Sequence, residues 1–301
     1  MPNWNDVLVE ISGAQSPIDI VRQKYLKQLA DFTGRNVICY YSGWLQKPGN
    51  AKANIDDDDR NGLMAAVHGM DRTKGLDLIL HTPGGSIAAT ESIVHYLRQM
   101  FGSNIRAIVP QIAMSAGTMI ACSAKSIVMG KQSNLGPIDP QFGGIPAWGV
   151  IKEFHRAIEE IKKDPASAPI WQQVVNKYHP TFLGECENAM TLANDMVTNW
   201  LISGMFSSQP KKEEKAEIVV EALNNHDDSL THERHFHLEQ LQELGLEIET
   251  LESDDTFQDL TLTVHHAFMH TFPNTLAIKI IENHHGQAVV QNVPPVNSNH
   301  R

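Results

Sequence analysis

The stretch from residue 76 to residue 130 decides the fold: "LDLILHTPGGSIAATESIVHYLRQMFGSNIRAIVPQIAMSAGTMIACSAKSIVMG". It begins with an apolar run at 76–80, typical of a short strand buried on both faces, and continues into a Pro-Gly-Gly turn. Helix-like and strand-like segments then alternate as helix 87–102, strand 104–110, helix 115–124 and strand 125–130. This alternation predicts right-handed βαβ units and a mostly parallel sheet, which makes the fold class α/β.

The flanking sequence extends this pattern and then departs from it. Before the stretch, we expect a helix at 16–34, a β-branched and aromatic strand at 36–45, and a helix that begins with the acidic run at 56–59. After Ile151 the chain changes to long amphipathic segments with polar joints. We therefore predict an α/β catalytic domain at 1–206 and a helical C-terminal extension at 207–301, with a frayed tail from His284.

The composition excludes several classes of protein. The formal net charge of −11 argues against nucleic acid as the main partner, because such binding calls for a basic surface. The three cysteines, Cys39, Cys122 and Cys186, form no CxxC pair and fit a reducing compartment. The N-terminus lacks the pattern of a signal peptide, and polar residues break the most apolar stretch, 107–124. We expect a cytoplasmic protein without stable membrane insertion.

Ser115 is a lone hydroxyl in that uncharged stretch. It would begin a helix just beyond one strand, while Gly84 and Gly85 follow the neighbouring strand. Ligands bind at the carboxyl ends of parallel strands, where glycine lets backbone amides approach a substrate. A serine opposite such amides suits acyl transfer, with a nucleophile and an oxyanion hole. The alternatives are a buried hydroxyl that bonds a backbone carbonyl and an ordinary Pro-Gly-Gly turn.

Three segments, "HTPGGS", "AMSAGT" and "GKQSNLGPIDPQFGG", resemble the caseinolytic protease/crotonase superfamily. Within it, the chain is most similar to the signal peptide peptidase-like serine peptidases of the serine dehydrogenase proteinase family. This resemblance spans about residues 37–206 and implies a core of repeated ββα units and a homo-oligomer. It also implies a nucleophile at Ser115 and oxyanion amides from Gly85, possibly Gly84, and Ala116.

One departure from the superfamily concerns the general base. Caseinolytic proteases carry a catalytic histidine in the place where this chain has Asp139, which is 24 residues after Ser115. The signal peptide peptidase-like branch uses a lysine, and the resemblance points to Lys152, which is 37 residues after Ser115. An exposed lysine has a pKa of about 10.4 and is charged at neutral pH, whereas burial among apolar groups favours the neutral base. The apolar residues at 145–151 would supply that burial.

Other readings of these candidates stay open. Lys152 could be an exposed lysine at a helix start, and His155 is the second candidate for the base. Lys125 and Lys131 flank a strand and suit surface positions. Ser86 suits a helix cap, and the acidic run 56–59 suits a solvated helix start without the spacing of a calcium loop.

Two histidine groups suggest a metal, but neither has the spacing of a known zinc motif. They are His232, His235 and His237, and His265, His266 and His270. We therefore expect no metal and no organic cofactor.

The sequence thus predicts a serine peptidase that cleaves peptides or unfolded proteins through a Ser115–Lys152 dyad. The apolar segment 142–151 favours a homo-oligomer, because it would expose too many large side chains on a monomer. Two alternatives remain at this stage: a crotonase-like acyl-CoA enzyme, and a non-catalytic oligomeric scaffold.

Overall fold

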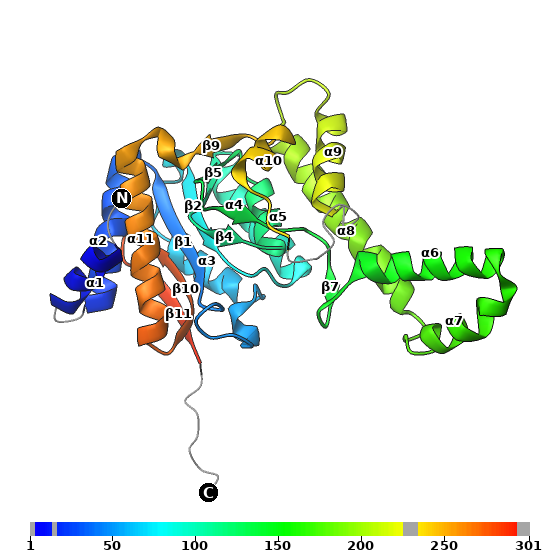
Figure 1. The fold of residues 1–301 in the computed structure, drawn as a ribbon. Coiled ribbons are helices and arrows are strands. Elements are labelled where there is room, and N and C mark those ends of the chain that lie inside the picture. Colours follow the sequence, from blue (N-terminus) through cyan, green and yellow to red (C-terminus); the bar gives the residue numbers. More distant parts are fainter. Residues whose placement is uncertain (1–3, 14–16, 225–233, 294–301) are drawn as a thin grey trace, which may run out of the picture.

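A seven-stranded mixed sheet forms the centre of the molecule (Figure 1). The computed structural model describes residues 4–13, 17–224 and 234–293. Along the sheet the strands are β11 (Ala288–Asn292), β10 (Ala277–Asn283), β1 (Asn36–Ser42), β2 (Leu76–His81), β3 (Ile105–Val109), β5 (Ser126–Met129) and β9 (Ile248–Thr250). The five strands from β1 to β9 are parallel, and β10 and β11 each run antiparallel to their neighbours.

Helices cover both faces of this sheet, which explains the continuous apolar runs of its central strands. Every residue of β1 and β2 is buried. One face is covered by α1 (Trp4–Gly13), α2 (Pro17–Thr33) and α11 (Asp255–Asn274). The other face is covered by α3 (Asp59–Val67), α4 (Ile87–Phe101), α5 (Ala116–Cys122), α9 (Lys212–Asn224), α10 (Leu238–Glu243) and the C-terminal half of α8 (Phe182–Ser203).

Short elements connect the layers. β4 (Ile112–Ala113) pairs in parallel with β6 (Asn134–Leu135), so β3, β4 and α5 form a ββα unit of the kind that the resemblance implies. Short 3-10 turns lie at η1 (Ala51–Ala53), η2 (Arg72–Lys74), η3 (Pro165–Ser167) and η4 (Leu251–Ser253). Within the described residues, no helix combines the length and the apolar character needed to cross a membrane.

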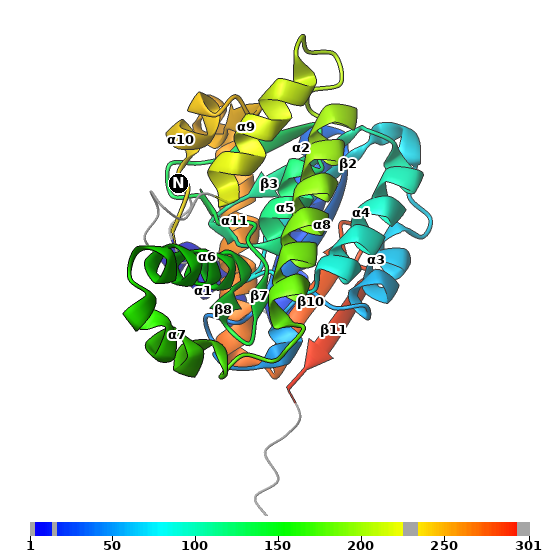
Figure 2. The same ribbon diagram turned by 90° about the vertical axis from the view of Figure 1, so that its right-hand side faces the viewer.

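Residues 141–190, which we call the arm, project from the body of the molecule (Figures 1 and 2). The arm contains the hairpin of β7 (Gln141–Phe142) and β8 (Ile145–Pro146), α6 (Ala147–Lys163), α7 (Ala168–Val175) and the N-terminal half of α8. It has a small apolar cluster of its own, separate from the core beneath the sheet.

The structure differs from the expected helical extension at 207–301. Residues after 206 alternate helices with β9, β10 and β11, and all three strands belong to the main sheet. The tail expected to fray from His284 includes β11, while residues 294–301 lie outside the described residues. The sequence of β10, "AIKIIEN", contains two charged residues, Lys279 and Glu282, which do not suggest a buried strand. In the structure both are buried, because each forms an ion pair.

Candidate active site

The loops that follow β2 and β3 lie side by side. A parallel bridge joins Thr82 to Ala113, and the amide of Met114 donates to the Thr82 carbonyl at 3.0 Å. The amide of Thr82 donates in turn to the carbonyl of Ile112 at 3.3 Å. Because these bonds link the loops just before their functional segments, the Pro-Gly-Gly turn and Ser115 are held against each other.

Gly84 occupies a position that only glycine fits. Its φ is +98°, in a region that side chains with a Cβ avoid. A Cβ built there would lie 2.8 Å from the Cβ of Ser115 and 3.0 Å from the amide nitrogen of Ala116. The glycine therefore lets its loop pack directly onto the backbone around Ser115.

Ser115 itself has a strained backbone. Its φ is +50° and its ψ is −116°, and it is the residue immediately before α5. Most serines at this position cap the helix, but the Ser115 hydroxyl makes no cap hydrogen bond. The side chain is half-buried and lines a cleft. A hydroxyl that is held in a strained position and not used by its own helix is typical of a nucleophile.

Gly85 is fixed by a third segment of the chain. It forms a parallel bridge with Ile55, whose amide donates to the Gly84 carbonyl at 2.8 Å and whose carbonyl accepts from the Ser86 amide at 2.9 Å. Successive peptide groups of an extended chain point to opposite sides, so the Gly85 amide points away from Ile55. The Gly84 amide donates to the hydroxyl of Thr82 at 3.2 Å.

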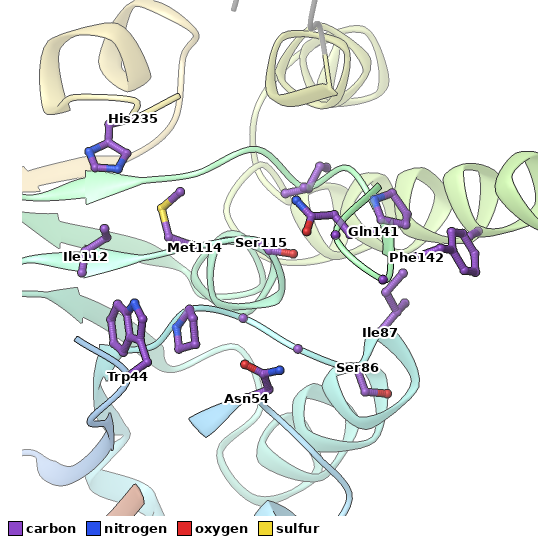
Figure 3. Close-up of a pocket in the computed structure, with 18 of the residues that line it drawn as sticks. Trp44, Asn54, Ser86, Ile87, Ile112, Met114, Ser115, Gln141, Phe142 and His235 are labelled. Atoms are coloured by element: carbon purple, nitrogen blue, oxygen red, sulfur yellow. The ribbon is translucent and has the colours of Figure 1, made fainter. Parts of the chain in front are cut away.

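The cleft around Ser115 has a volume of about 1230 Å³. Figure 3 shows Ser115 at the start of its helix, with Trp44, Ile112 and Met114 toward one end of the cleft and Gln141 and Phe142 toward the other. Other lining residues come from distant segments, and the sequence patterns gave no indication of four of them: Trp44, Leu45, Asn54 and Ala189. His235 was considered only as a metal ligand, and Ile138 and Gln141 only as part of the segment that resembles the superfamily. Among the described residues that line the cleft, none is an aspartate, glutamate, lysine or arginine.

Lys152 lies on α6, in the arm, and is not among the residues that line the cleft. Its side chain is exposed in the single chain, with the ammonium 4.3 Å from the centroid of the Trp148 ring. The burial expected from the apolar segment 145–151 is thus not supplied by one chain, because Ile145 is itself 48% exposed. Asp139 is fully buried, and its carboxylate accepts from the Trp148 amide at 3.3 Å, at the start of α6.

Most of the other residues considered in the sequence analysis have structural roles or lie on the surface. Ser86 caps α4, since its hydroxyl accepts from the Ala89 amide at 3.3 Å, and it also lines the cleft. Lys125, Lys131 and His155 are exposed. The acidic run was expected to be solvated, but its last residue, Asp59, is fully buried because Lys279 pairs with it from β10.

The histidines form no metal site within the described part of the chain. His265 is buried on α11, next to the Tyr41 hydroxyl and the ring of His81, and burial lowers its pKa to about 3. Burial also holds the pKa of His81 well below its ordinary value. His235 is exposed and lines the cleft, whereas His232 lies outside the described residues.

Comparison with known proteins identifies the family. The family model described as ClpP-like SDH-type serine proteinase matches residues 48–271, about three quarters of the chain. The chain belongs to this family. The match of this ClpP-like serine proteinase includes both loops of the cleft and the whole arm, and it continues past residue 206 into α11.

Two curated relatives of this ClpP-like serine proteinase share about a third of their aligned residues with it. The uncharacterized protein MJ0137 of Methanocaldococcus jannaschii is 29% identical over 240 residues, which cover 77% of this chain and 75% of that protein. The uncharacterized protein MJ1495 of the same organism is 34% identical over 110 residues, or 36% of this chain and 37% of that protein. A solved structure of a mutant of the 1510-N membrane-bound stomatin-specific protease aligns with a TM-score of 0.38 at 16% identity, over 69% of this chain and 79% of that one.

Proposed function

We propose that the protein is a serine peptidase whose nucleophile is Ser115. The observation that carries the proposal is the hydroxyl of Ser115, which begins α5 from a strained backbone without capping it and lines a large cleft against Gly84. Membership of the ClpP-like serine proteinases supports the reaction class.

The oxyanion site in this proposal consists of the amides of Gly85 and Ala116. The Ser115 oxygen attacks the carbonyl carbon of the substrate peptide, and the carbonyl oxygen gains negative charge as the tetrahedral intermediate forms. The Ala116 amide, in the first turn of α5, has no acceptor within its helix. We prefer Gly85 to Gly84 as the second donor because the Gly84 amide already donates to Thr82. Loss of one such donor typically slows catalysis by about 10²- to 10³-fold.

Lys152 is the proposed general base. It would take the proton of the Ser115 hydroxyl, pass it to the leaving amine when the C–N bond breaks, and then activate the water that releases the acyl group. A lysine can do this only in its neutral form, which removal of water favours. The exposed position of Lys152 in one chain therefore requires another surface to cover the arm.

A second copy of the chain is the proposed cover. The arm exposes Ile145 and Ile170 at 48% and 69%, and holds an open apolar groove of about 600 Å³. Phe142 and Phe182 line this groove, and Phe142 also lines the cleft. Contact between copies at this place would exclude water from α6 and would close the cleft to folded proteins, as in a closed homo-oligomer.

The proposed substrate is an unfolded peptide segment without formal charge. Within the part of the chain that the structure describes, apolar and uncharged polar side chains line the cleft, except for His235 at one side. A charged segment would lose water there without gaining an ionic partner. We therefore expect apolar or neutral polar side chains next to the cleaved bond.

A serine-directed fluorophosphonate tests the nucleophile. We expect the probe to modify Ser115, as identified by mass spectrometry, and we expect Ser115→Ala to lose both labelling and hydrolysis of unfolded casein while it unfolds at the same urea concentration. Ser123→Ala is the matched control, since this serine lies at the other end of α5 and bonds the Ile120 carbonyl. Hydrolysis by purified Ser115→Ala would refute the assignment, and retention of acyl-CoA without labelling would favour the crotonase-like alternative.

A further inference from the structure

A short irregular segment, residues 53–56, holds the Gly84–Gly85 loop in place. The bridge between Ile55 and Gly85 leaves no space between the two chains, because a Cβ on Gly85 would collide with the backbone nitrogen and oxygen of Ile55. Any movement of Ile55 would therefore move the peptide group of Gly85. Asn54, the neighbour of Ile55, lines the cleft.

This segment lies outside the main sheet, and buried side chains hold it from beneath. The Lys279 ammonium, on β10, donates to the Asn54 carbonyl at 2.6 Å and to the Asp59 carboxylate at 2.7 Å. The second oxygen of Asp59 accepts from the Tyr40 hydroxyl at 2.7 Å and from the Asp56 amide at 2.9 Å. Lys279 and Asp59 are 1% and 0% exposed.

A buried ion pair is a poor means of stabilising a fold, since removing two charges from water offsets most of their attraction. Burial also raises the pKa of Asp59, although Lys279 partly opposes that rise. In some proteins such pairs are kept for the single geometry that they impose. Here the pair fixes the position of the Asn54 carbonyl, and Asn54 immediately precedes Ile55, which forms the bridge to Gly85.

We propose that Lys279 is a positioning residue for the oxyanion site: with Asp59, it fixes residues 54–56, and Ile55 thereby fixes the Gly85 amide beside Ser115. This inference rests on the proposed function, in which the Gly85 amide binds the oxyanion. Lys279 does not touch the substrate. It acts through two backbone segments, and it comes from the part of the chain after residue 206.

The chain offers a matched control on the opposite face of the same strand. Glu282, also on β10, pairs with Arg22 of α2, and both are as deeply buried as Lys279 and Asp59. Arg22 also donates to Thr271 of α11 and to Asp19 of its own helix, on the side of β10 away from residues 53–56. Lys279→Met and Arg22→Met each leave one buried carboxylate without its partner, so we expect both to lower stability by similar amounts.

The experiment compares these variants in the full-length protein per active site, with active sites counted by fluorophosphonate titration. We expect Lys279→Met to lower kcat about 100-fold with little change in KM, because an oxyanion contact is made in the transition state. A peptide aldehyde, whose adduct places an oxyanion in the same site, should bind more weakly by a similar factor. Arg22→Met should keep the wild-type kcat per titrated site and the wild-type aldehyde affinity.

Milder variants keep the test valid if Lys279→Met does not fold. Tyr40→Phe removes one donor to Asp59, whereas Tyr41→Phe removes the neighbouring hydroxyl, which contacts His265 on the other face of β1. We expect Tyr40→Phe to lower kcat and aldehyde affinity together by about threefold to tenfold, because Asp59 loses one donor but keeps its pairing with Lys279. Tyr41→Phe should change neither.

Unchanged kcat and aldehyde affinity in the Lys279 and Tyr40 variants would overturn the positioning role alone. Wild-type protein that neither cleaves peptide nor binds the aldehyde would instead overturn the proposed function, and the positioning role with it.

Discussion

The body around Ser115 and the arm around Lys152 differ in how completely one chain builds them. Ser115, Gly84 and Gly85 are held by hydrogen bonds between three backbone segments and rest on a core in which Ala116 is fully buried. The arm has only a small cluster, and α6 exposes Lys152 and Ile158. The proposed nucleophile and oxyanion amides are thus fixed by folding, whereas the proposed base requires a second surface.

The largest expected effect concerns that base. Lys152→Ala should lower peptidase kcat by about 10³-fold or more, because without its base the serine hydroxyl is a weak nucleophile. Removing one residue of a catalytic unit can cost about as much activity as removing all of them. Lys152→Ala should remain folded, since the side chain is exposed.

Two controls decide whether Lys152 is the base. His155→Ala, on the same helix, and His235→Ala, which removes an imidazole from the cleft, test the other available bases. If either histidine variant is inactive while Lys152→Ala cleaves casein at the wild-type rate, that histidine is the base and Lys152 is not.

A smaller effect is expected from the surface of the arm. Phe142→Glu places a charge in the apolar groove where we expect a second copy, so it should shift the oligomer toward monomer in light scattering. Activity should fall about 10- to 100-fold at low protein concentration and recover in part at high concentration. Leu276→Glu, at a 56% exposed position on the body, is the control. A fully active wild-type monomer would show that the arm completes the site without a partner.

The smallest expected effect concerns how the stability of the body and of the arm depends on pH. His81 and His265 are buried in the body, while His155 and His179 of the arm are exposed. The folded-state pKa of His265 is lowered to about 3 by burial, so the unfolded chain binds its proton first and stability falls as pH drops from about 6.5 toward 3. Within that pH range His265 contributes a slope of about 1.4 kcal/mol per pH unit.

Urea unfolding at several pH values between about 4 and 5.5 measures this slope, because there the unfolded chain holds the proton and the folded chain does not. His265→Phe should make the slope shallower by about 1.4 kcal/mol per unit, whatever it does to stability at pH 7. His95→Gln, an exposed position on α4, should leave it unchanged. An identical slope in His265→Phe and wild type would show that this imidazole is protonated in the folded state.

The sequence patterns predicted the part of the fold that local periodicity controls. The strands at 76–80, 104–110 and 125–130 and the helices between them match β2, β3, β5, α4 and α5 closely. Because parallel strands end at one edge of a sheet, the meeting of Gly84 with Ser115 could also be expected. The Ser86 cap is likewise a local interaction.

What could not be predicted depends on long-range pairing. Lys279 and Glu282 suggest a solvated segment, and only their partners Asp59 and Arg22, more than 200 residues away, allow β10 to be a buried strand. Asn54 reaches the cleft through the same contacts. The surroundings of Lys152 could not be read from its apolar neighbours either, since these side chains indicate burial but not which surface provides it.

The pairing of β10 with β1 also has a consequence in time. A ribosome releases β1 and the Ser115 segment long before it has made residues 277–283, so the central sheet lacks an interior strand until those residues have left the ribosome. Residues 53–56 lack Lys279 over the same interval. A nascent chain therefore carries the Ser115 hydroxyl without the contacts that hold the proposed oxyanion site, and we expect it to be inactive until β10 has joined the sheet.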